Sequence, residues 1–380
     1  MAGISILTPK GFRAAGVSAG IKTKRGALDV GALVCERPAT AAALFTTNKV
    51  VGAPVTVSRE AIRGGKLRAL IVNSGNSNAC TGRRGLQDAR RMTRLCANAL
   101  GISAGEVLVA STGIIGVPMP MKKIAEGIQA ACSKVSASAK AADDFAASIL
   151  TTDLRKKVAG RQFLLGKKKI TIAGVAKGSG MIAPNMATML AFLTTDADIT
   201  AKALQGARKT AADESFNALT VDGHTSTSDT VAIMASGLAE NTRMKPGSAG
   251  AKKFAKALGE VCRDLAYQIV ADAEGGTKVI EVRVSGAASP EDAKKAARAI
   301  ADSPLVKCAF NGEDPNWGRI VSAAGYSGAA LDPARVDLEV NGHLLYRHGS
   351  PATFDAETVS ESIRAERETS IVLRVGDGPA

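Results

Sequence analysis

Apolar and polar positions along the chain follow two rhythms, one typical of helices and one of buried strands. Apolar residues that recur every three or four positions predict an amphipathic helix, and short apolar runs between glycine or polar clusters predict strands. The strongest helical pattern spans residues 251–270, where Phe254, Leu258, Leu265 and Ile269 share one face. Further helices are predicted over residues 86–100, from 120, from 200 to about 217 and from 290, and strands over 68–72, 106–110, 162–165, 170–173, 279–284, 336–340, 343–346 and 370–375.

The order of these elements predicts an α+β protein whose sheets are covered by helices. Its 380 residues suit two domains or one large body. The pair Asn341-Gly342 predicts a hairpin turn, and the lysine run 167–169 is interpreted as a second turn, between two strands. No GxGxxG fingerprint joins a strand to a helix, so a dinucleotide-binding fold is not supported.

Composition narrows the class of protein. Apolar residues make up 46% and charged residues 22% of the chain, which is typical of a globular protein with a core. No apolar run approaches the ~20 residues that span a bilayer, and the N-terminus does not resemble a secretory signal. The three histidines show no metal-ligand spacing, so we expect no structural zinc site. Six widely spaced cysteines predict buried free thiols in a reducing cytosol: Cys35, Cys80, Cys96, Cys132, Cys262 and Cys308.

The formal net charge of +14 admits two interpretations. One is nucleic-acid binding, which would weaken steeply with salt. The other is a basic solvated surface that also favours small anionic substrates. Lysines and arginines are scattered among acids, and aromatic residues for base stacking make up only 3% of the chain. The pattern therefore favours the second interpretation and no nucleic-acid partner.

One segment, residues 174–195, concentrates unusual chemistry. It reads GVAKGSGMIAPNMATMLAFLTT, with a lysine, three glycines and a Pro-Asn pair before Thr188 and an apolar run after it. This pattern predicts a threonine at the tip of a buried strand. Such a threonine can act as a nucleophile, and cleavage of the bond before it would free an α-amine that can serve as its base.

Four polar loop clusters are further candidates for a site: residues 111–113, 151–153, 177–188 and 272–278. Taken singly, each pattern is more typical of a structural feature. Ser-Thr-Gly after a strand usually forms a turn or a helix cap, Thr-Thr-Asp usually forms a cap, and a lysine in a glycine loop is usually a solvated charge. Only their combination indicates chemistry.

That combination resembles a known family. The segment KGSGMIAPNMATMLAFLTTDA is preceded by STGIIG and TTD and followed by DGHTSTSD, EGGTK and DPNWGR. Together these motifs are similar to the ornithine acetyltransferase family (bifunctional glutamate N-acetyltransferase, ArgJ). The similarity keeps its order from TPKGFRAAGVSAGIK near the N-terminus to RVGDGPA at the C-terminus. It implies a layered α/β/β/α sandwich of the self-processing type found in this family and in DmpA-like aminopeptidases.

The resemblance also implies that the precursor cuts itself between Ala187 and Thr188, into an alpha chain of residues 1–187 and a beta chain of residues 188–380. The Thr188 hydroxyl would attack the preceding carbonyl, and water would release the ester. The freed α-amine titrates near pH 8, so a useful fraction can accept the hydroxyl proton at cytosolic pH.

The implied reaction is a ping-pong acetyl transfer in arginine biosynthesis, from N2-acetyl-L-ornithine to Thr188 and then to L-glutamate. Thr112 and Gly113 are implied as the oxyanion hole, and Thr151, Lys177, Thr188 and Glu274 as substrate contacts. No metal or organic cofactor is implied, and the resemblance leaves open whether acetyl-CoA is a second donor. It further implies a cytoplasmic heterotetramer of two alpha and two beta chains, with no membrane partner.

Two departures from the family pattern stand out. The family usually continues past the GDG stretch into a tail that supplies an asparagine and a terminal hydroxyl residue to the substrate pocket, whereas this sequence ends at Ala380. His224 stands in DGHTSTSD where an acid is expected, and we interpret it as a surface loop residue. A self-processing amidase or aminopeptidase of related fold, in which water takes the acyl group, remains the alternative function.

Overall fold

The computed structural model describes residues 3–183 and 189–380 and divides the chain into two compact units. The first unit ends at Glu274, and the second runs from Gly275 to Ala380. This spatial division differs from the predicted division into fragments 1–187 and 188–380. The predicted cleavage site, Ala187–Thr188, lies outside the described residues.

One sheet runs through the first unit in the order β4-β3-β2-β8-β7-β6-β5, and β1 pairs with β2 beside this path. The pairs β3–β4 and β7–β8 are parallel, and the other pairs are antiparallel. The strands are β1 Phe12–Val17, β2 Val30–Phe45, β3 Lys66–Asn76, β4 Val107–Ile114, β5 Lys157–Leu165, β6 Lys168–Lys177, β7 Leu190–Thr195 and β8 Thr230–Ala235.

The long strand β2 belongs to both halves of this sheet. Val30 to Val34, Ala39 and Thr40 pair with β3, and the last part, Thr40 to Phe45, pairs with β8. The register of the β3 pairing shifts between Val34 and Ala39, just before the pairing with β8 begins at Thr40. The sheet can therefore fold back on itself at β2, so that β1, β3 and β4 make one layer and β5 to β8 another.

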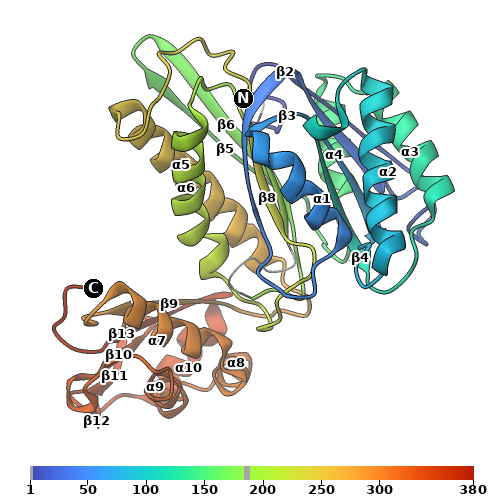
Figure 1. The fold of residues 1–380 in the computed structure, drawn as a ribbon. Coiled ribbons are helices and arrows are strands. Elements are labelled where there is room, and N and C mark those ends of the chain that lie inside the picture. Colours follow the sequence, from blue (N-terminus) through green and yellow to red (C-terminus); the bar gives the residue numbers. More distant parts are fainter. Residues whose placement is uncertain (1–2, 184–188) are drawn as a thin grey trace. The chain divides into compact units, whose positions relative to one another are not determined.

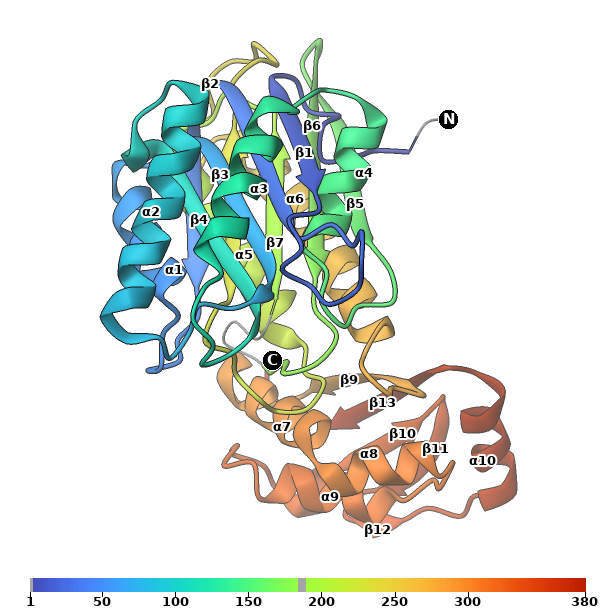
Figure 2. The ribbon, with the colours of Figure 1, turned by 90° about the vertical axis from the view of Figure 1, so that its right-hand side faces the viewer.

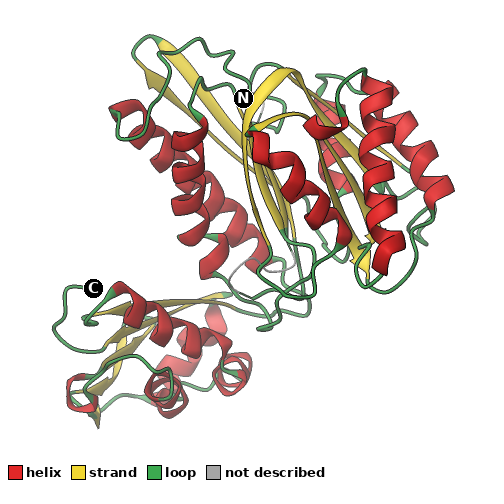
Figure 3. Ribbon diagram, in the orientation of Figure 1, coloured by secondary structure: helices red, strands yellow, loops and turns green. Residues whose placement is uncertain are grey.

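Three apolar cores show the layering. Along β7, Leu190 and Phe192 belong to a middle core shared with β2, β3 and β4, whereas Ala191 and Leu193 belong to an outer core with helices α5 and α6. A second outer core joins β3 and β4 to helices α1, α2 and α3. The alternation follows from the two-residue period of a strand. The predicted α/β/β/α sandwich is confirmed, and Figure 1 and Figure 3 show strands between the two helical layers.

The helices of the first unit begin and end where the sequence provides caps. The Thr200 side chain accepts from Ala203 N at the start of α5, and Gly101, whose φ is +64°, caps the C-terminus of α2. The helix predicted to reach about residue 217 ends earlier, at Asp213. Figure 2 shows α2 and α3 over the sheet half of β3 and β4. The helices are α1 Ala53–Ala61, α2 Gly82–Leu100, α3 Met121–Ser133, α4 Ala139–Ser148, α5 Ala201–Asp213 and α6 Ala249–Ala271, and 3-10 turns span Ile62–Gly64, Ala104–Glu106 and Phe216–Ala218.

The second unit has its own sheet, in the order β12-β11-β10-β13-β9, and its own apolar core. The hairpin predicted at Asn341-Gly342 is confirmed, and both residues have positive φ. Ser289 caps the helix that begins with Pro290, as predicted. The elements are β9 Val279–Ser285, β10 Asp337–Val340, β11 His343–Arg347, β12 Ser350–Pro351, β13 Glu368–Arg374, α7 Pro290–Asp302, α8 Pro304–Asn311, α9 Trp317–Gly325 and α10 Ala356–Ala365, with a 3-10 turn at Pro333–Arg335.

Two structural expectations need correction. All six cysteines are free, but Cys80 and Cys308 are exposed rather than buried. In the lysine run, only Lys167 lies in the β5–β6 turn, because Lys168 and Lys169 already pair with β5. Within the described ranges, no helix is long and apolar enough to cross a membrane.

Candidate active site

The predicted site residues converge where strand ends from both sheet layers meet. Strand β6 ends at Lys177 and β7 begins at Leu190, and these two residues are register partners. The predicted nucleophile Thr188 lies outside the described residues. The residue after it, Met189, is buried, and its backbone N–H donates to Asp229 Oδ1 at 3.0 Å. The start of the apolar run is therefore fixed beside Lys177.

The predicted oxyanion-hole residues, Thr112 and Gly113, lie within β4 itself. The interpretation of Ser-Thr-Gly as a turn or cap is wrong, because β4 continues through these residues and pairs with β3. Gly113 has a φ of +132°, and an added Cβ would overlap the backbone of Gly75 and Asn76. Only glycine fits this position, and it allows another backbone to approach closely.

Lys177 lies at the centre of the site. Its side chain is buried, and its ammonium donates to Thr112 Oγ1 across the two layers at 3.3 Å. Burial lowers the pKa of Lys177, while the nearby charges of Asp153, Asp229 and Glu274 oppose that shift. The interpretation of a solvated loop lysine is wrong, since the residue ends a strand inside the sandwich.

The predicted contact Thr151 is held by Asp153. The Asp153 carboxylate accepts from Thr151 N at 2.9 Å, from Gly178 N at 2.6 Å and from Lys157 Nζ at 2.7 Å. Burial raises the pKa of Asp153, but Lys177 and Lys157 outweigh burial and hold it below its ordinary value. Asp153 is therefore a buried carboxylate that ties the Thr151 loop to the end of β6, and not a helix cap.

The predicted contact Glu274 is attached to the same end of β6. Its backbone N–H donates to Ser179 O at 2.8 Å, and Ser179 Oγ donates to Asp272 O at 2.8 Å. The Glu274 side chain is exposed and lies over Gly180, where an added Cβ would overlap Glu274 Oε2. The structure thus brings together Thr112, Gly113, Thr151, Lys177 and Glu274, all of the predicted site residues that it describes.

Two aspartates of the DGHTSTSD motif hold the surrounding loops. The exposed Asp222 accepts from Met181 N at 2.6 Å and from Ile182 N at 2.8 Å, which fixes a loop where Met181 has a φ of +57°. Asp229 is fully buried, and burial raises its pKa well above the ordinary value, against the effects of Met189 N and Lys177. His224 is exposed, as predicted for a loop residue.

Sequence reasoning missed Lys157, and it assigned no specific role to Asp153, Asp229 or Asp272, which stand in the candidate clusters or motifs. Both Asp153 and Asp229 stand in the motifs that carried the resemblance, so position in a motif was a usable signal. No such signal marks Lys157, because it stands among other basic residues in RKKV. Only its burial, at 1% side-chain exposure, distinguishes it from its neighbour Lys156, at 39%.

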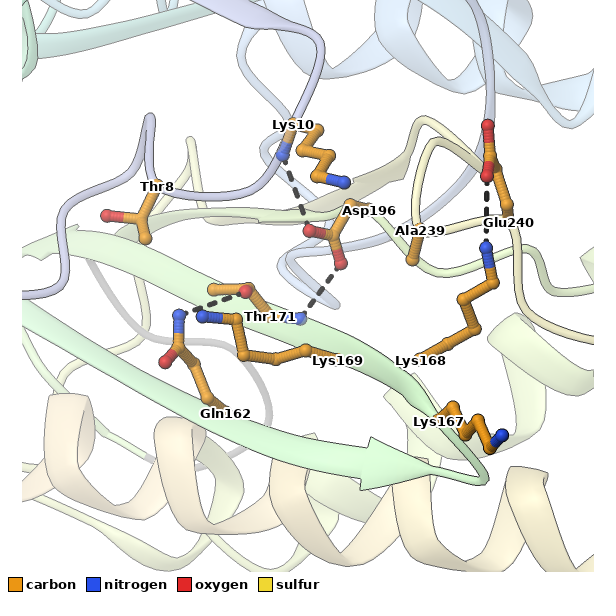
Figure 4. A pocket seen from close by; sticks show the side chains of 10 residues that line it. All are labelled: Thr8, Lys10, Gln162, Lys167, Lys168, Lys169, Thr171, Asp196, Ala239 and Glu240. Carbon is orange, nitrogen blue, oxygen red and sulfur yellow. Dashed lines mark hydrogen bonds and ion pairs between the residues drawn. The ribbon is translucent and has the colours of Figure 1, made fainter.

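A separate pocket lies at the other end of β6, and no predicted site residue lines it. Figure 4 shows its lining side chains, among them Lys10, Lys168 and Lys169, with Asp196 accepting from Thr171 N and Lys168 paired with Glu240. Its volume is about 390 Å³.

Over residues 3–183 and 189–380, no three histidine, cysteine, aspartate or glutamate side chains converge in a way that could hold a metal ion.

This arrangement suits acyl transfer to or from an amino acid. The Thr112 hydroxyl of β4 contacts the buried ammonium of Lys177, and Gly113 follows it in the same strand. Hydroxyl and backbone N–H donors of this kind stabilise a developing oxyanion. A buried lysine also binds a carboxylate, and the exposed Glu274 carboxylate can bind an amine.

Comparisons with known proteins give consistent results. The family model described as "ArgJ family" matches residues 13–380. The arginine biosynthesis bifunctional protein ArgJ of Symbiobacterium thermophilum is 50% identical over 360 residues, which cover 94% of this chain and 89% of that protein. A crystal structure of the protein of that name from Bacillus halodurans is 48% identical, with a TM-score of 0.47, over 48% of this chain and 95% of that one. The ornithine acetyltransferase of Mycobacterium tuberculosis, solved with ornithine, is 36% identical, with a TM-score of 0.43, over 48% and 96%.

Proposed function

This chain belongs to the ArgJ family, and from that premise we propose that it is a bifunctional glutamate N-acetyltransferase of arginine biosynthesis. It transfers the acetyl group of N2-acetyl-L-ornithine to L-glutamate. The observation that carries the proposal is the buried contact between Lys177 Nζ and Thr112 Oγ1, which brings a carboxylate-binding cation and an oxyanion donor to one point.

The proposed chemistry is ping-pong. The Thr188 hydroxyl attacks the acetyl carbonyl of acetylornithine, and its proton passes to the Thr188 α-amine. The resulting α-ammonium gives this proton to the departing nitrogen, and ornithine leaves as the carbon–nitrogen bond breaks. Glutamate then attacks the acetyl-threonine ester and carries the acetyl group away. Each tetrahedral intermediate places its negative oxygen against Thr112 Oγ1–H and Gly113 N–H, while Thr151, Lys177 and Glu274 hold the amino-acid part of the substrate.

Self-cleavage at Ala187–Thr188 supplies the α-amine. The fold supports this part of the proposal because the two predicted fragments share one sheet. Strand β6 precedes the bond and β7 follows it, and six register pairs from Ile172↔Thr195 to Lys177↔Leu190 join them. The fragments therefore stay associated when the bond breaks. The mature enzyme is proposed to be a cytoplasmic heterotetramer of two alpha and two beta chains.

The name "bifunctional" in the relatives supports a second activity for this chain, in which acetyl-CoA donates the acetyl group to glutamate. We propose acetyl-CoA as this second substrate, with no metal or bound organic cofactor. The same acetyl-Thr188 intermediate serves both donors.

An assay of the purified chain tests the proposal. With acetylornithine as donor, the expected result is stoichiometric formation of acetylglutamate and ornithine when glutamate is present, and little acetate. Release of acetate regardless of glutamate would instead indicate the amidase or aminopeptidase alternative. Acetylglutamate formation from acetyl-CoA tests the second activity separately.

A further inference from the structure

We infer that Lys157 is a positioning residue for the substrate pocket, because its ammonium joins the three segments that carry Thr151, Lys177 and Glu274. This inference rests on the proposed function, in which those three residues bind the amino-acid substrates. Lys157 is the first residue of β5 and has 1% side-chain exposure. Among the described residues, its hydrogen bonds go to Asp153, Arg155 and Asp272 and not to Thr112 or Gly113.

The Lys157 ammonium donates three hydrogen bonds, which matches its three protons. Nζ donates to Asp153 Oδ1 at 2.7 Å, to Asp272 Oδ2 at 2.6 Å and to Arg155 O at 3.3 Å. The two carboxylate side chains are 0% and 5% exposed. A cation that is buried and fully bonded between two buried anions has one position only, so it fixes the separation of those anions.

Each anion in turn holds backbone that leads directly to a predicted contact. Asp153 accepts from Thr151 N and from Gly178 N, the residue after Lys177. Asp272 is two residues before Glu274, and its carbonyl accepts from Ser179 Oγ, while Ser179 O accepts from Glu274 N. The hydrogen-bonded network around Lys157 therefore reaches the backbone at, or within two residues of, each of the three predicted contacts: Thr151, Lys177 and Glu274.

The second acceptor also fixes the segment that leads into β5. Asp272 Oδ2 accepts from Leu154 N at 3.0 Å and from Arg155 N at 3.3 Å in addition to Lys157 Nζ. Residues 151–157, the end of β6 and residues 272–274 are therefore tied at one cluster of charges. The sequence separation is 115 residues between Lys157 and Asp272 and 25 residues between Asp153 and Gly178.

The inference predicts a specific kinetic change. Groups that bind a substrate equally in its ground and transition states affect KM rather than kcat. Loss of the Lys157 charge lets the three contacts drift apart, so KM rises for both acetylornithine and glutamate while kcat changes little. Small misplacements of binding groups have effects of up to about 10²-fold, which sets the expected scale.

The test compares K157M with the matched control K156M. Lys156 is the neighbouring lysine, half-exposed and paired with Asp143. The expected result is a rise in both KM values of roughly 10- to 100-fold in K157M and none in K156M. Unchanged KM values with a lower active fraction would overturn the inference, because that is the result of a purely structural role.

A second variant covers the case in which K157M fails to fold, since it leaves two buried carboxylates unpaired. D272N keeps a side chain of the same shape with one acceptor oxygen but removes the negative charge. We expect a smaller rise of both KM values, of several-fold, and unchanged KM values in folded D272N would overturn the inference.

Amide hydrogen exchange gives a readout that does not depend on activity. The expected result is faster exchange in all three peptides that contain Thr151, Gly178 and Glu274, in K157M or D272N but not in K156M. Faster exchange confined to the peptide around residue 157 would overturn the inference. If the wild-type enzyme shows no acetyl transfer, the proposed function is overturned. The hydrogen-exchange comparison would then still test whether Lys157 positions the three segments.

Discussion

Each end of strand β6 carries a lysine, which is exposed at the start of the strand and buried at its end. At its start, Lys168 is 48% exposed and pairs with the exposed Glu240 at 3.0 Å, in the open pocket of Figure 4. At its end, Lys177 is 2% exposed and is surrounded by Thr112, Asp153, Asp229 and Glu274. Both ends bear a lysine beside acids, so residue type does not distinguish them.

The two ends differ in how far water reaches the lysine. Water screens the Lys168 pair, and such exposed pairs contribute little to stability. Lys177 has lost most of its water, so the same kinds of charges act on it much more strongly, and its surroundings must be fixed by hydrogen bonds. A buried, fixed charge costs folding free energy but is ready to bind a substrate carboxylate without reorganisation. We therefore place the chemistry at the Lys177 end.

The largest expected effect comes from removing the predicted nucleophile at that end. Thr188→Ala should leave one full-length chain of 38.9 kDa instead of two fragments, because no hydroxyl attacks the Ala187 carbonyl. Acetyl transfer should fall on the order of 10⁶-fold, the scale seen when a nucleophile is removed. Intact mass and the transfer assay measure both results. A cleaved Thr188→Ala sample would rule out self-cleavage by this residue.

The next effect concerns the oxyanion hole on the opposite layer. Thr112→Ala removes the hydroxyl that faces Lys177 and should reduce kcat about 10²- to 10³-fold with little change in KM. Thr112→Ser, which keeps the hydroxyl, is the matched control and should retain most of the activity. Steady-state kinetics with acetylornithine and glutamate measure both variants, and equal kcat values for the two would exclude this role for the hydroxyl.

A third prediction uses the pKa of Lys177, which burial lowers from 10.5. Between the folded and unfolded pKa values, the unfolded state binds more protons, so this residue adds stability as pH rises and loses it as pH falls through the folded pKa. The difference in the free energy of unfolding between wild type and Lys177→Met should therefore increase toward pH 10.5, by at most about 1.4 kcal/mol per pH unit. Urea unfolding across this range measures it. A pH-independent difference would show that Lys177 stays charged.

The smallest effect is expected at the other end of β6. Lys168→Ala and Glu240→Ala, alone or together, should leave kcat, KM and the pattern of two fragments unchanged, because the pair is exposed and lies apart from the predicted site residues. The same assays measure this result. A changed KM would contradict the contrast between the two ends and would connect the lysine-lined pocket with catalysis.

The elements were largely predictable because strand and helix periods are local properties of the sequence. The caps at Thr200 and Ser289, the stop at Gly101 and the Asn341-Gly342 turn are each explained by residues that lie next to one another. Predicted strands were too short where polar residues continue a buried strand. Strand β3 runs to Asn76 and β4 to Ile114, because the two strands continue to pair with each other through these polar residues.

The sequence could propose the candidate site as a set of residues but could not give their arrangement. Ser-Thr-Gly, Thr-Thr-Asp and the Lys177 loop each have a common structural explanation, and their joint order in the chain carried the resemblance. Which of the many lysines is buried could not be predicted, since Lys156 and Lys157 are neighbours of the same type with opposite environments.

From the sequence alone, periodicity predicted the elements of an α+β protein, because strand and helix periods are local. The order of the motifs indicated the family, and the resemblance implied the α/β/β/α class and the candidate site residues. The tertiary structure alone decided which distant groups meet, such as Lys177 with Thr112 and Lys157 with Asp272, and which charges lose their water. The physical reason is that burial depends on how the two layers of the bent sheet stack. A charge acquires its binding strength from that stacking and not from its neighbours in sequence.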